Sequence, residues 1–216
     1  YPDGNSFALR EKVASKFSVN HDQIVFGNGS NDILELVARA FLQAGDEVIY
    51  SQHAFAVYAL VTQAVGATGV VVPAKEFGHD LDAFLSAITP KTKLIFIANP
   101  ISRSFSKAYG LAGLRIGFGL MHASIADMLN RVRQPFNVNS IAQAAAVASL
   151  ADDDFVARSY AANQAGMAQI TQGLQKLGLS YIPSFANFVS FKIQNAAQIN
   201  QQLLKNGVIV RPIANY

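Results

Sequence analysis

The chain has 216 residues, of which 51% are hydrophobic and 14% charged, and its 17 basic and 14 acidic residues give a formal net charge of +3. This composition is too apolar and too weakly charged for a disordered chain, and the length suits one large domain or one and a half. The absence of cysteine excludes disulfides, thiolate metal sites and cysteine catalysis, and fits a reducing compartment. No run of basic residues indicates a nucleic-acid surface, and the longest charge-free stretch contains Gln, Asn and Ser, which argues against a membrane span.

The first two-thirds of the chain alternates between helical and strand patterns. Apolar residues at helical spacing predict helices at 7–17, 33–41, 54–65 and 81–88. Short apolar runs predict strands at 23–26, 47–50, 68–72 and 94–98. This β–α–β–α order favours an α/β domain with a mostly parallel sheet covered by helices on both faces.

The last third of the chain has a different pattern. An Ala-rich helix is predicted at 139–150, and a long helix is predicted from Asp152 to about Leu177, with carboxylates at its start. A strand, a helix and a strand are then predicted at 181–193, 196–204 and 208–212. We therefore expect a large domain over residues 1–150 and a smaller, incomplete α+β domain over residues 151–216.

Two predicted strands follow each other too closely, at 94–98 and 101–105. Parallel neighbours need a crossover of a dozen or more residues, and no hairpin-type loop separates these two runs. The sequence therefore suggests that a segment is missing between Pro100 and Ile101.

The segment from Ser104 to Gly117 carries the most chemical information. Lys107 lies between a strand end and a glycine-rich turn, with Ser104 and Ser106 before it and Arg115 eight residues after it. A lysine whose pKa is lowered by burial or by a neighbouring cation can form a Schiff base. The two hydroxyls and the guanidinium have the donors that bind a phosphate. Because Ser-x-x-Lys is a short motif that often occurs by chance, an exposed turn lysine is the alternative at this point.

A second candidate anion site is the run Gly27-Asn-Gly-Ser-Asn-Asp32, between a predicted strand and a predicted helix. Free N–H groups and the dipole at the start of a helix attract anions. The Gly-x-Gly pattern alone also fits a Rossmann-like turn or a simple tight turn. The run lacks the Gly-Lys-Ser/Thr ending of a P-loop.

Ser-x-x-Lys followed by Gly-x-x-Gly-x-Arg-x-Gly resembles, over fourteen positions, the cofactor-lysine motif of the pyridoxal-phosphate aminotransferases of fold type I. The resemblance implies that the chain is an enzyme in which Lys107 forms a Schiff base with pyridoxal 5'-phosphate. It also implies that Ser104 and Arg115 bind the phosphate of this cofactor, with Ser106 as a possible additional ligand. The implied fold is a large domain with a mostly parallel sheet and a smaller C-terminal α+β domain.

The same resemblance assigns roles to residues outside the lysine motif. Gly29, Ser30 and Asn31 would bind the cofactor phosphate, and Phe55 would stack on the pyridine ring. An ordinary core aromatic is the alternative reading of Phe55. Arg211 would help to bind the substrate, and an exposed strand-end arginine is its alternative. No metal site is expected, because the four histidines show no metal-ligand spacing.

Within that family the chain is most similar to the histidinol-phosphate aminotransferases, in its Tyr1-Pro-Asp-Gly start, the Gly-Asn-Gly-Ser turn, the lysine motif and Ser184-Phe-Ala-Asn-Phe188. The resemblance implies exchange of an amino group between L-histidinol phosphate and 2-oxoglutarate in histidine biosynthesis, with Lys107 as the base. It also implies a cytoplasmic homodimer in which Tyr1 reaches the neighbouring subunit's cofactor phosphate. An aromatic amino acid aminotransferase, a threonine-phosphate decarboxylase and a non-catalytic cofactor-binding module are the alternatives.

The chain departs from the family pattern in two places. Three family residues are absent between Pro100 and Ile101. They are the asparagine that contacts the hydroxyl of the cofactor ring, the aspartate that holds the pyridine nitrogen protonated, and a nearby tyrosine. The chain also stops at Tyr216, before the family's carboxylate-binding arginine. The first departure coincides with the junction identified from the strand pattern, so omitted segments are the interpretation that we favour.

Overall fold

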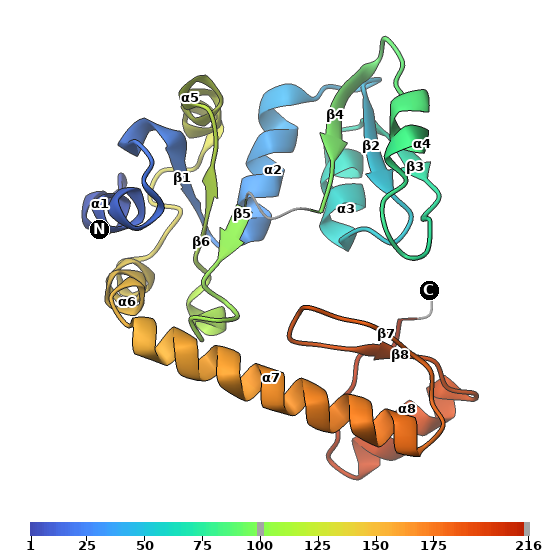
Figure 1. The fold of residues 1–216 in the computed structure, drawn as a ribbon. Helices are drawn as coiled ribbons and strands as arrows, with labels where there is room; N and C mark the ends of the chain where they lie inside the picture. The colour runs from blue at the N-terminus through green and yellow to red at the C-terminus, as the bar shows by residue number, and fades with distance from the viewer. Residues whose placement is uncertain (99–101, 214–216) are drawn as a thin grey trace. The chain divides into compact units, whose positions relative to one another are not determined.

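The computed structural model describes residues 1–98 and 102–213, and the chain divides into two compact units, Tyr1–Asp153 and Asp154–Tyr216 (Figure 1). The described strands of the first unit form two three-stranded sheets, in the orders β1-β6-β5 and β3-β2-β4. The elements up to the start of the second unit are α1 (Phe7–Phe17), η1 (His21–Gln23), β1 (Ile24–Gly27), α2 (Ser30–Phe41), β2 (Glu47–Ser51), α3 (Ala56–Ala64), β3 (Thr68–Val72), α4 (Leu81–Ser86), β4 (Thr92–Phe96), β5 (Ser102–Ser104), η2 (Ala112–Leu114), β6 (Gly117–Leu120), α5 (Ala123–Val132) and α6 (Ser140–Leu150).

The sheet β1-β6-β5 is antiparallel and ends in a row of small residues. Strand β6 runs antiparallel to both β1 and β5, so β1 and β5 run in the same direction. The register places Gly117 of β6 opposite both Gly27 of β1 and Ser104 of β5. The last residues of β1 and β5 therefore lie beside the first residue of β6, at the end of the sheet where the two candidate motifs begin.

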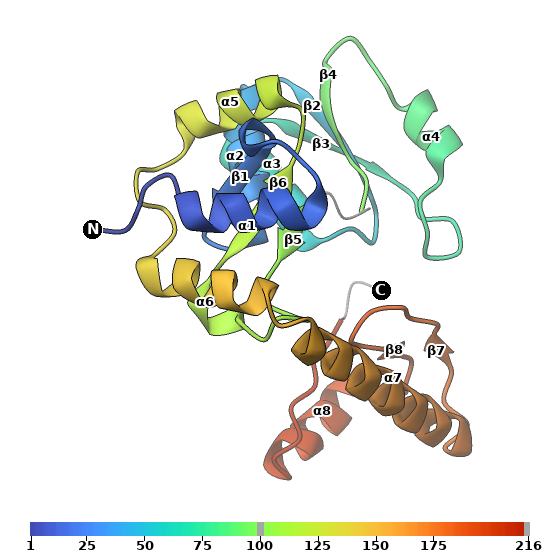
Figure 2. The ribbon, with the colours of Figure 1, turned by 60° about the vertical axis from the view of Figure 1, so that its left-hand side comes forward.

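Helices cover both faces of this sheet (Figure 2). Because side chains alternate along a strand, Ile24 and Phe26 of β1 pack with α1 and α6 on one face. Val25 points to the opposite face, where it packs with α2 and α5. The core on the first face includes the fully buried rings of Phe105 and Phe118. These two layers fix the end of the sheet and the turns that follow it.

The sheet β3-β2-β4 is parallel, with β2 in the centre. Val48 and Tyr50 pack on one face with Tyr58 of α3 and Ala38 of α2, whereas Ile49 packs on the other face with Phe84 of α4. Helix α2 thus contributes to the cores beside both sheets and lies between them in Figure 1. The parallel strands and the helical cover confirm the α/β class that the sequence predicts.

The second unit contains most of α7 (Asp153–Lys176), followed by β7 (Tyr181–Ile182), β8 (Ser190–Phe191) and α8 (Ala196–Lys205). The two short strands pair with each other and are antiparallel. Leu174 is the buried residue of α7, so this unit has a small core. Of the helices in the described residues, none combines the length and hydropathy needed to cross a membrane.

Two expectations about secondary structure are wrong, and two elements were not predicted at all. The predicted strand at 208–212 is irregular, because Val208, Ile209 and Val210 are exposed and pair with no strand among the described residues. The strand predicted at 181–193 is reduced to the short pair β7 and β8. Strand β6 and helix α5 were not expected, and β6 makes the first sheet antiparallel.

The suspected break between Pro100 and Ile101 lies outside the described residues. The strands on either side of it, β4 and β5, belong to different sheets. They are not neighbours in either sheet. This arrangement leaves β4 and β5 each with one edge that no strand covers among residues 1–98 and 102–213.

Candidate active site

The candidate site begins where the first turn of α2 packs against β6. A side-chain carbon added at Gly117 would lie 2.5 Å from the backbone nitrogen of Ser30 and 2.8 Å from the carbonyl carbon of Gly29. Real side-chain carbons do not approach other atoms so closely, so a residue with a side chain at position 117 would push α2 away from β6. Gly117 therefore allows the two anion-binding motifs of the sequence to meet.

Arg115 lies directly against the glycine turn. A side-chain carbon added at Gly29 would collide with the guanidinium of Arg115, and Gly29 has a φ of 88°, which favours glycine. Arg115 Nη1 donates to the carbonyl of Ala112 at 3.1 Å, which holds the guanidinium of this exposed side chain. The start of α2 and the arginine of the lysine motif are therefore neighbours in space.

We call the group formed by Gly29, Ser30, Ser104 and Arg115 the anion cradle. Gly29 precedes the first turn of α2 and provides no side-chain cap, so this residue leaves the helix N–H groups free to meet a ligand. The α2 dipole and the Arg115 guanidinium both favour a negative charge at this place. Ser104 Oγ accepts a hydrogen bond from the backbone N–H of Ser106 at 3.0 Å, which leaves the hydroxyl hydrogen of Ser104 available.

Lys107 lies in the turn that leaves β5, three residues after Ser104. The backbone N–H of Gly110 donates to the carbonyl of Lys107 at 2.9 Å, and the N–H of Leu111 donates to the carbonyl of Phe105 at 2.9 Å. The ring of Phe105 is fully buried and anchors the turn in the core. The side chain of Lys107 is exposed and makes no hydrogen bond or ion pair with the residues that the structure describes.

Four other predicted residues lie outside the anion cradle or at its margin. Asn31 is exposed in the first turn of α2, next to the cradle. Phe55 precedes α3, is 49% exposed, and packs edge-on against Tyr58 at a centroid distance of 6.1 Å. The exposed ring of Tyr1 lies 5.4 Å from that of Phe136 on the same chain. The predicted substrate residue Arg211 is exposed in the irregular stretch of the second unit.

Three polar residues beside the cradle were not singled out from the sequence: Asp32, Arg133 and Asn137. Asp32 Oδ2 accepts hydrogen bonds from the backbone N–H of Asn28 at 2.9 Å and from Asn137 Nδ2 at 3.0 Å. Asp32 belongs to the glycine-turn motif and could have been suspected as an acidic residue in the first turn of a helix. Asn137 is 105 positions away from Asp32, and no local pattern connects the two.

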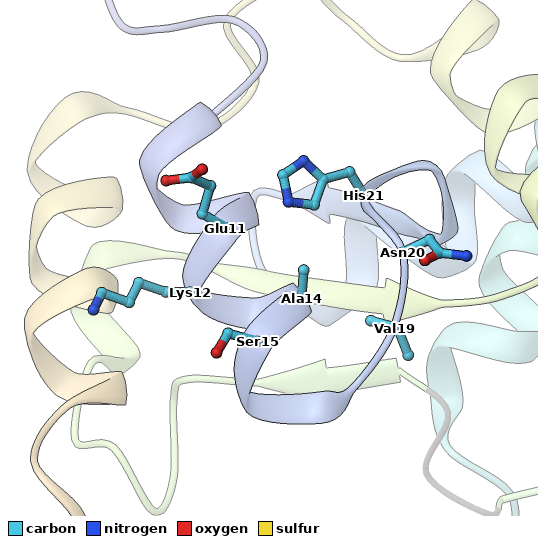
Figure 3. Close-up of a pocket in the computed structure, with 7 residues that line it drawn as sticks. All are labelled: Glu11, Lys12, Ala14, Ser15, Val19, Asn20 and His21. Carbon is cyan, nitrogen blue, oxygen red and sulfur yellow. The ribbon is translucent and has the colours of Figure 1, made fainter.

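A shallow depression elsewhere in the first unit has no part in this site (Figure 3). It has a volume of about 720 Å³ and lies along the surface of α1 and the residues that follow it. Its lining residues are Glu11, Lys12, Ala14, Ser15, Val19, Asn20 and His21. None of them is a predicted site residue. Among the described residues, no group of three or more His, Cys, Asp or Glu side chains could hold a metal ion.

The class I and II aminotransferase family matches the chain over residues 1–102 and again over residues 101–216. The chain belongs to this family. This result confirms the aminotransferase family inferred from the lysine motif, and the match covers both units. The family match consists of two parts that overlap at residues 101–102, next to the junction that the strand pattern singled out.

Curated relatives of this aminotransferase include the histidinol-phosphate aminotransferase of Methylobacillus flagellatus, which is 57% identical over 271 residues, covering 100% of the chain and 73% of that protein. The histidinol-phosphate aminotransferase 2 of Nitrosospira multiformis is 48% identical over 272 residues, covering 100% of the chain and 69% of that protein.

Solved structures show the same fold. The histidinol-phosphate aminotransferase of Sinorhizobium meliloti in complex with pyridoxal-5'-phosphate aligns with a TM-score of 0.87 and 24% identity, over 99% of the chain and 75% of that structure. Aspartate aminotransferase from Thermus thermophilus aligns with a TM-score of 0.80 and 22% identity, over 95% of the chain and 73% of that structure. The fold of our aminotransferase is therefore that of these enzymes.

Proposed function

We propose that the chain is a pyridoxal-phosphate-dependent histidinol-phosphate aminotransferase of histidine biosynthesis, which exchanges an amino group between L-histidinol phosphate and 2-oxoglutarate. The observation that carries this proposal is the 57% identity to a histidinol-phosphate aminotransferase over the whole chain. The fold shared with aminotransferases supports the reaction type. Aromatic amino acid transamination and threonine-phosphate decarboxylation are not favoured by any of these relatives.

The anion cradle fits the phosphate of this cofactor. It combines a helix N-terminus, a serine hydroxyl and a guanidinium, which are the donors that proteins use for phosphate. The site has no side chain at Gly29 to fill it, and Arg115 is held against the turn. In our proposal the residues that bind the phosphate are Gly29, Ser30, Asn31, Ser104, Ser106 and Arg115.

Lys107 is the residue to which we assign the covalent and acid–base roles. When bound, the cofactor supplies an electron sink for the carbanion chemistry at the substrate Cα. Lys107 would hold the cofactor through its amine and, once that amine is free, would take the proton from the substrate Cα. The position of Lys107 on a turn anchored by Phe105 supports both roles, because the Nζ can move while the backbone stays in place.

Three further assignments belong to the same proposal. Phe55 would stack on the cofactor ring, for which its half-exposed side chain leaves an accessible face. Arg211 would bind the substrate. We also propose a homodimer in which Tyr1 reaches the neighbouring subunit's cofactor phosphate, supported by the full exposure of the Tyr1 ring. A cytoplasmic location fits an enzyme of amino-acid biosynthesis.

We further propose that related enzymes carry an additional segment between the positions of Pro100 and Ile101. The aligned stretch of 271 residues exceeds the 216 residues of the chain by 271 − 216 = 55. The family match is also divided into two parts, which overlap at residues 101–102. Such a segment would lie between β4 and β5, so the large domain would span residues 1–150 with this addition and the small domain residues 151–216.

The proposal is tested by adding pyridoxal phosphate to the purified chain, reducing with borohydride and measuring the intact mass. We expect one reduced cofactor adduct, which peptide mapping places on Lys107. The variant Lys107→Ala should carry no adduct and should lose transamination of L-histidinol phosphate by a factor of about 10²–10⁴ or more, the range typical of a lost acid–base group. The matched control Lys91→Ala, which removes another exposed lysine, should behave like the unaltered chain.

Two results would contradict the proposal. An adduct on a lysine other than Lys107 would remove the assignment of the covalent residue. A chain that binds pyridoxal phosphate but transfers no amino group from L-histidinol phosphate would support the non-catalytic cofactor-binding module instead. An intact mass well above that of the 216 residues plus one reduced cofactor adduct would indicate an additional segment.

A further inference from the structure

We propose that Asp32, Asn137 and Arg133 are positioning residues that hold the glycine turn of the anion cradle in its anion-binding conformation. We call this group the polar bracket. The inference rests on the proposed function, because it concerns the site that we assign to the cofactor phosphate. None of the three residues belongs to the anion cradle itself.

The polar bracket forms hydrogen bonds with the backbone at both ends of the turn. On the strand side, Asn137 Nδ2 donates to the carbonyl of Phe26 at 3.0 Å, one residue before the turn begins. On the helix side, Asp32 Oδ2 accepts from the backbone N–H of Asn28 at 2.9 Å. Asn137 Nδ2 also donates to Asp32 Oδ2 at 3.0 Å, so one amide group connects the two ends. The conformation of the turn therefore depends on a residue far away in the sequence.

Arg133 fixes the orientation of the Asn137 amide. Its Nη1 donates to Asn137 Oδ1 at 3.0 Å, and its Nε donates to Asn130 Oδ1 at 3.2 Å. The oxygen of Asn137 thus faces a donor that cannot act as an acceptor, and both hydrogens of its Nδ2 are directed at Phe26 and Asp32. A flipped amide would place its NH₂ group against the guanidinium, so only one orientation satisfies all partners.

Arg133 also offsets the negative charge of Asp32. A carboxylate near the start of α2 stabilises the helix but would repel an anion bound at the same place. Burial lowers the pKa of Arg133 below its usual value, and the nearby carboxylate of Asp32 opposes this shift. The positive guanidinium of Arg133 therefore offsets part of the negative charge of the Asp32 carboxylate. The α2 dipole and Arg115 then determine the field in the cradle.

An experiment can distinguish residues that shape the phosphate-binding turn from residues that only stabilise the fold. Pyridoxal phosphate and pyridoxal share the ring and the aldehyde, and only the first has the phosphate. Loss of the polar bracket should weaken binding of pyridoxal phosphate and leave binding of pyridoxal almost unchanged. A residue that only stabilises the fold would affect both compounds equally. The ratio of the two dissociation constants therefore isolates the role that we assign.

The experiment compares the unaltered chain with three bracket variants and a control. Asn137→Ala and Asp32→Ala should each reduce the preference for pyridoxal phosphate over pyridoxal by about tenfold, the effect of losing one or two hydrogen bonds at the turn. Asp32→Asn should keep at least the same preference, because its Oδ1 can accept both hydrogen bonds and the lost negative charge no longer repels an anion. The control Asn163→Ala, which removes an asparagine that donates to the carbonyl of Ala186 in the second unit, should also keep it.

Hydrogen exchange of the backbone amides provides a second readout that needs no cofactor. In Asn137→Ala and Asp32→Ala, the amide of Asn28 should exchange at least tenfold faster than in the unaltered chain and in Asn163→Ala. If Asn137→Ala does not fold, Asp32→Ala serves in its place, because it removes the acceptor of the Asn28 N–H on the helix side of the turn.

The outcomes separate the inference from the proposed function. If the unaltered chain shows no preference for pyridoxal phosphate over pyridoxal, the assignment of the cradle to the phosphate fails, while faster exchange at Asn28 would still support the bracket. If the preference exists but Asn137→Ala and Asp32→Ala leave both the preference and the exchange unchanged, the positioning role is overturned. An equal loss of affinity for both compounds would also overturn it.

Discussion

Gly117 shows how one residue determines whether the two motifs of the site can meet. Its missing side chain leaves room for the backbone of Gly29 and Ser30, the start of α2. The sequence presents Gly117 only as the last position of the lysine motif, and the reason for a glycine there becomes visible once β6 lies beside α2. The absence of a side chain is therefore as important for the cradle as the donors that line it.

Replacing Gly117 with alanine should displace α2 and damage the cradle. The new methyl group would lie 2.5 Å from the nitrogen of Ser30, so the backbone must move, and overpacking of this kind costs about 1–3 kcal/mol. We expect a lower free energy of unfolding in urea and weaker binding of pyridoxal phosphate.

The control for this variant is Gly173→Ala. Gly173 lies inside α7, and a side-chain carbon added there would meet no atom within 4 Å. Alanine is the better helix former, so this control should gain up to about 1 kcal/mol. Equal stability of Gly117→Ala and the unaltered chain would show that α2 does not depend on close contact with β6.

At the scale of helices and strands, elements with a strong local pattern could be predicted and elements that depend on distant partners could not. Helix α1 matches its predicted range, and α2 differs from its predicted range only at the start. Strand β6 has the sequence Gly-Phe-Gly-Leu, whose two glycines give no clear strand signal, and it forms between β1 and β5. Helix α5 could have been predicted, because Ile125, Leu129 and Val132 have helical spacing.

The residues of the candidate site also fall into those that could be predicted from a local motif and those that could not. Lys107, Ser104 and Arg115 were predicted because they lie close together in one motif, and the structure places Ser104 and Arg115 beside the glycine turn. The polar bracket could not be predicted in full, because Asp32 and Asn137 meet only after the helices pack on the sheet. Residues that lie close together in one motif could therefore be predicted from the sequence, whereas the distant polar residues that hold the turn in place could not.

The start of α1 gives a prediction about pH. Asp3 accepts hydrogen bonds from the backbone N–H groups of Phe7 at 2.7 Å and Asn5 at 2.9 Å, and these bonds lower the pKa of Asp3 below its usual value of 3.8. Because the pKa of Asp3 is lower in the folded state, its carboxylate stabilises this region above about pH 3.8. This stabilisation is lost as the pH falls through the pKa that Asp3 has in the folded chain.

Asp3→Ala should therefore speed hydrogen exchange in the first turn of α1 near pH 7 relative to the unaltered chain. The difference should shrink at pH values below 3.8, where the carboxyl group becomes protonated. The exchange rates are compared after correction for their intrinsic pH dependence. A difference that stays constant across this range would mean that the charge of Asp3 contributes nothing to the start of α1.

At the scale of the whole molecule, the separation of the two sheets is the feature that relates most directly to the proposed additional segment. Within residues 1–98 and 102–213, β4 pairs with β2 alone and β5 pairs with β6 alone. Ile95 of β4 and Ile97 just beyond it are 37% and 45% exposed, which is unusual for a parallel strand. Apolar side chains beside an uncovered edge suggest that further residues would pack there.

Inserting the segment that we propose between Pro100 and Ile101, taken from the Methylobacillus flagellatus relative, should therefore stabilise the molecule. We expect a higher midpoint of thermal unfolding and tighter binding of pyridoxal phosphate, because new strands would cover the edges of β4 and β5 and the apolar surface beside them. A Gly/Ser linker of equal length is the control, since it adds chain without strands or apolar side chains. If the linker stabilises the chain as much as the natural segment does, the edges of the two sheets need no cover. If neither insertion changes the unfolding midpoint or the affinity, the two sheets are complete as they stand.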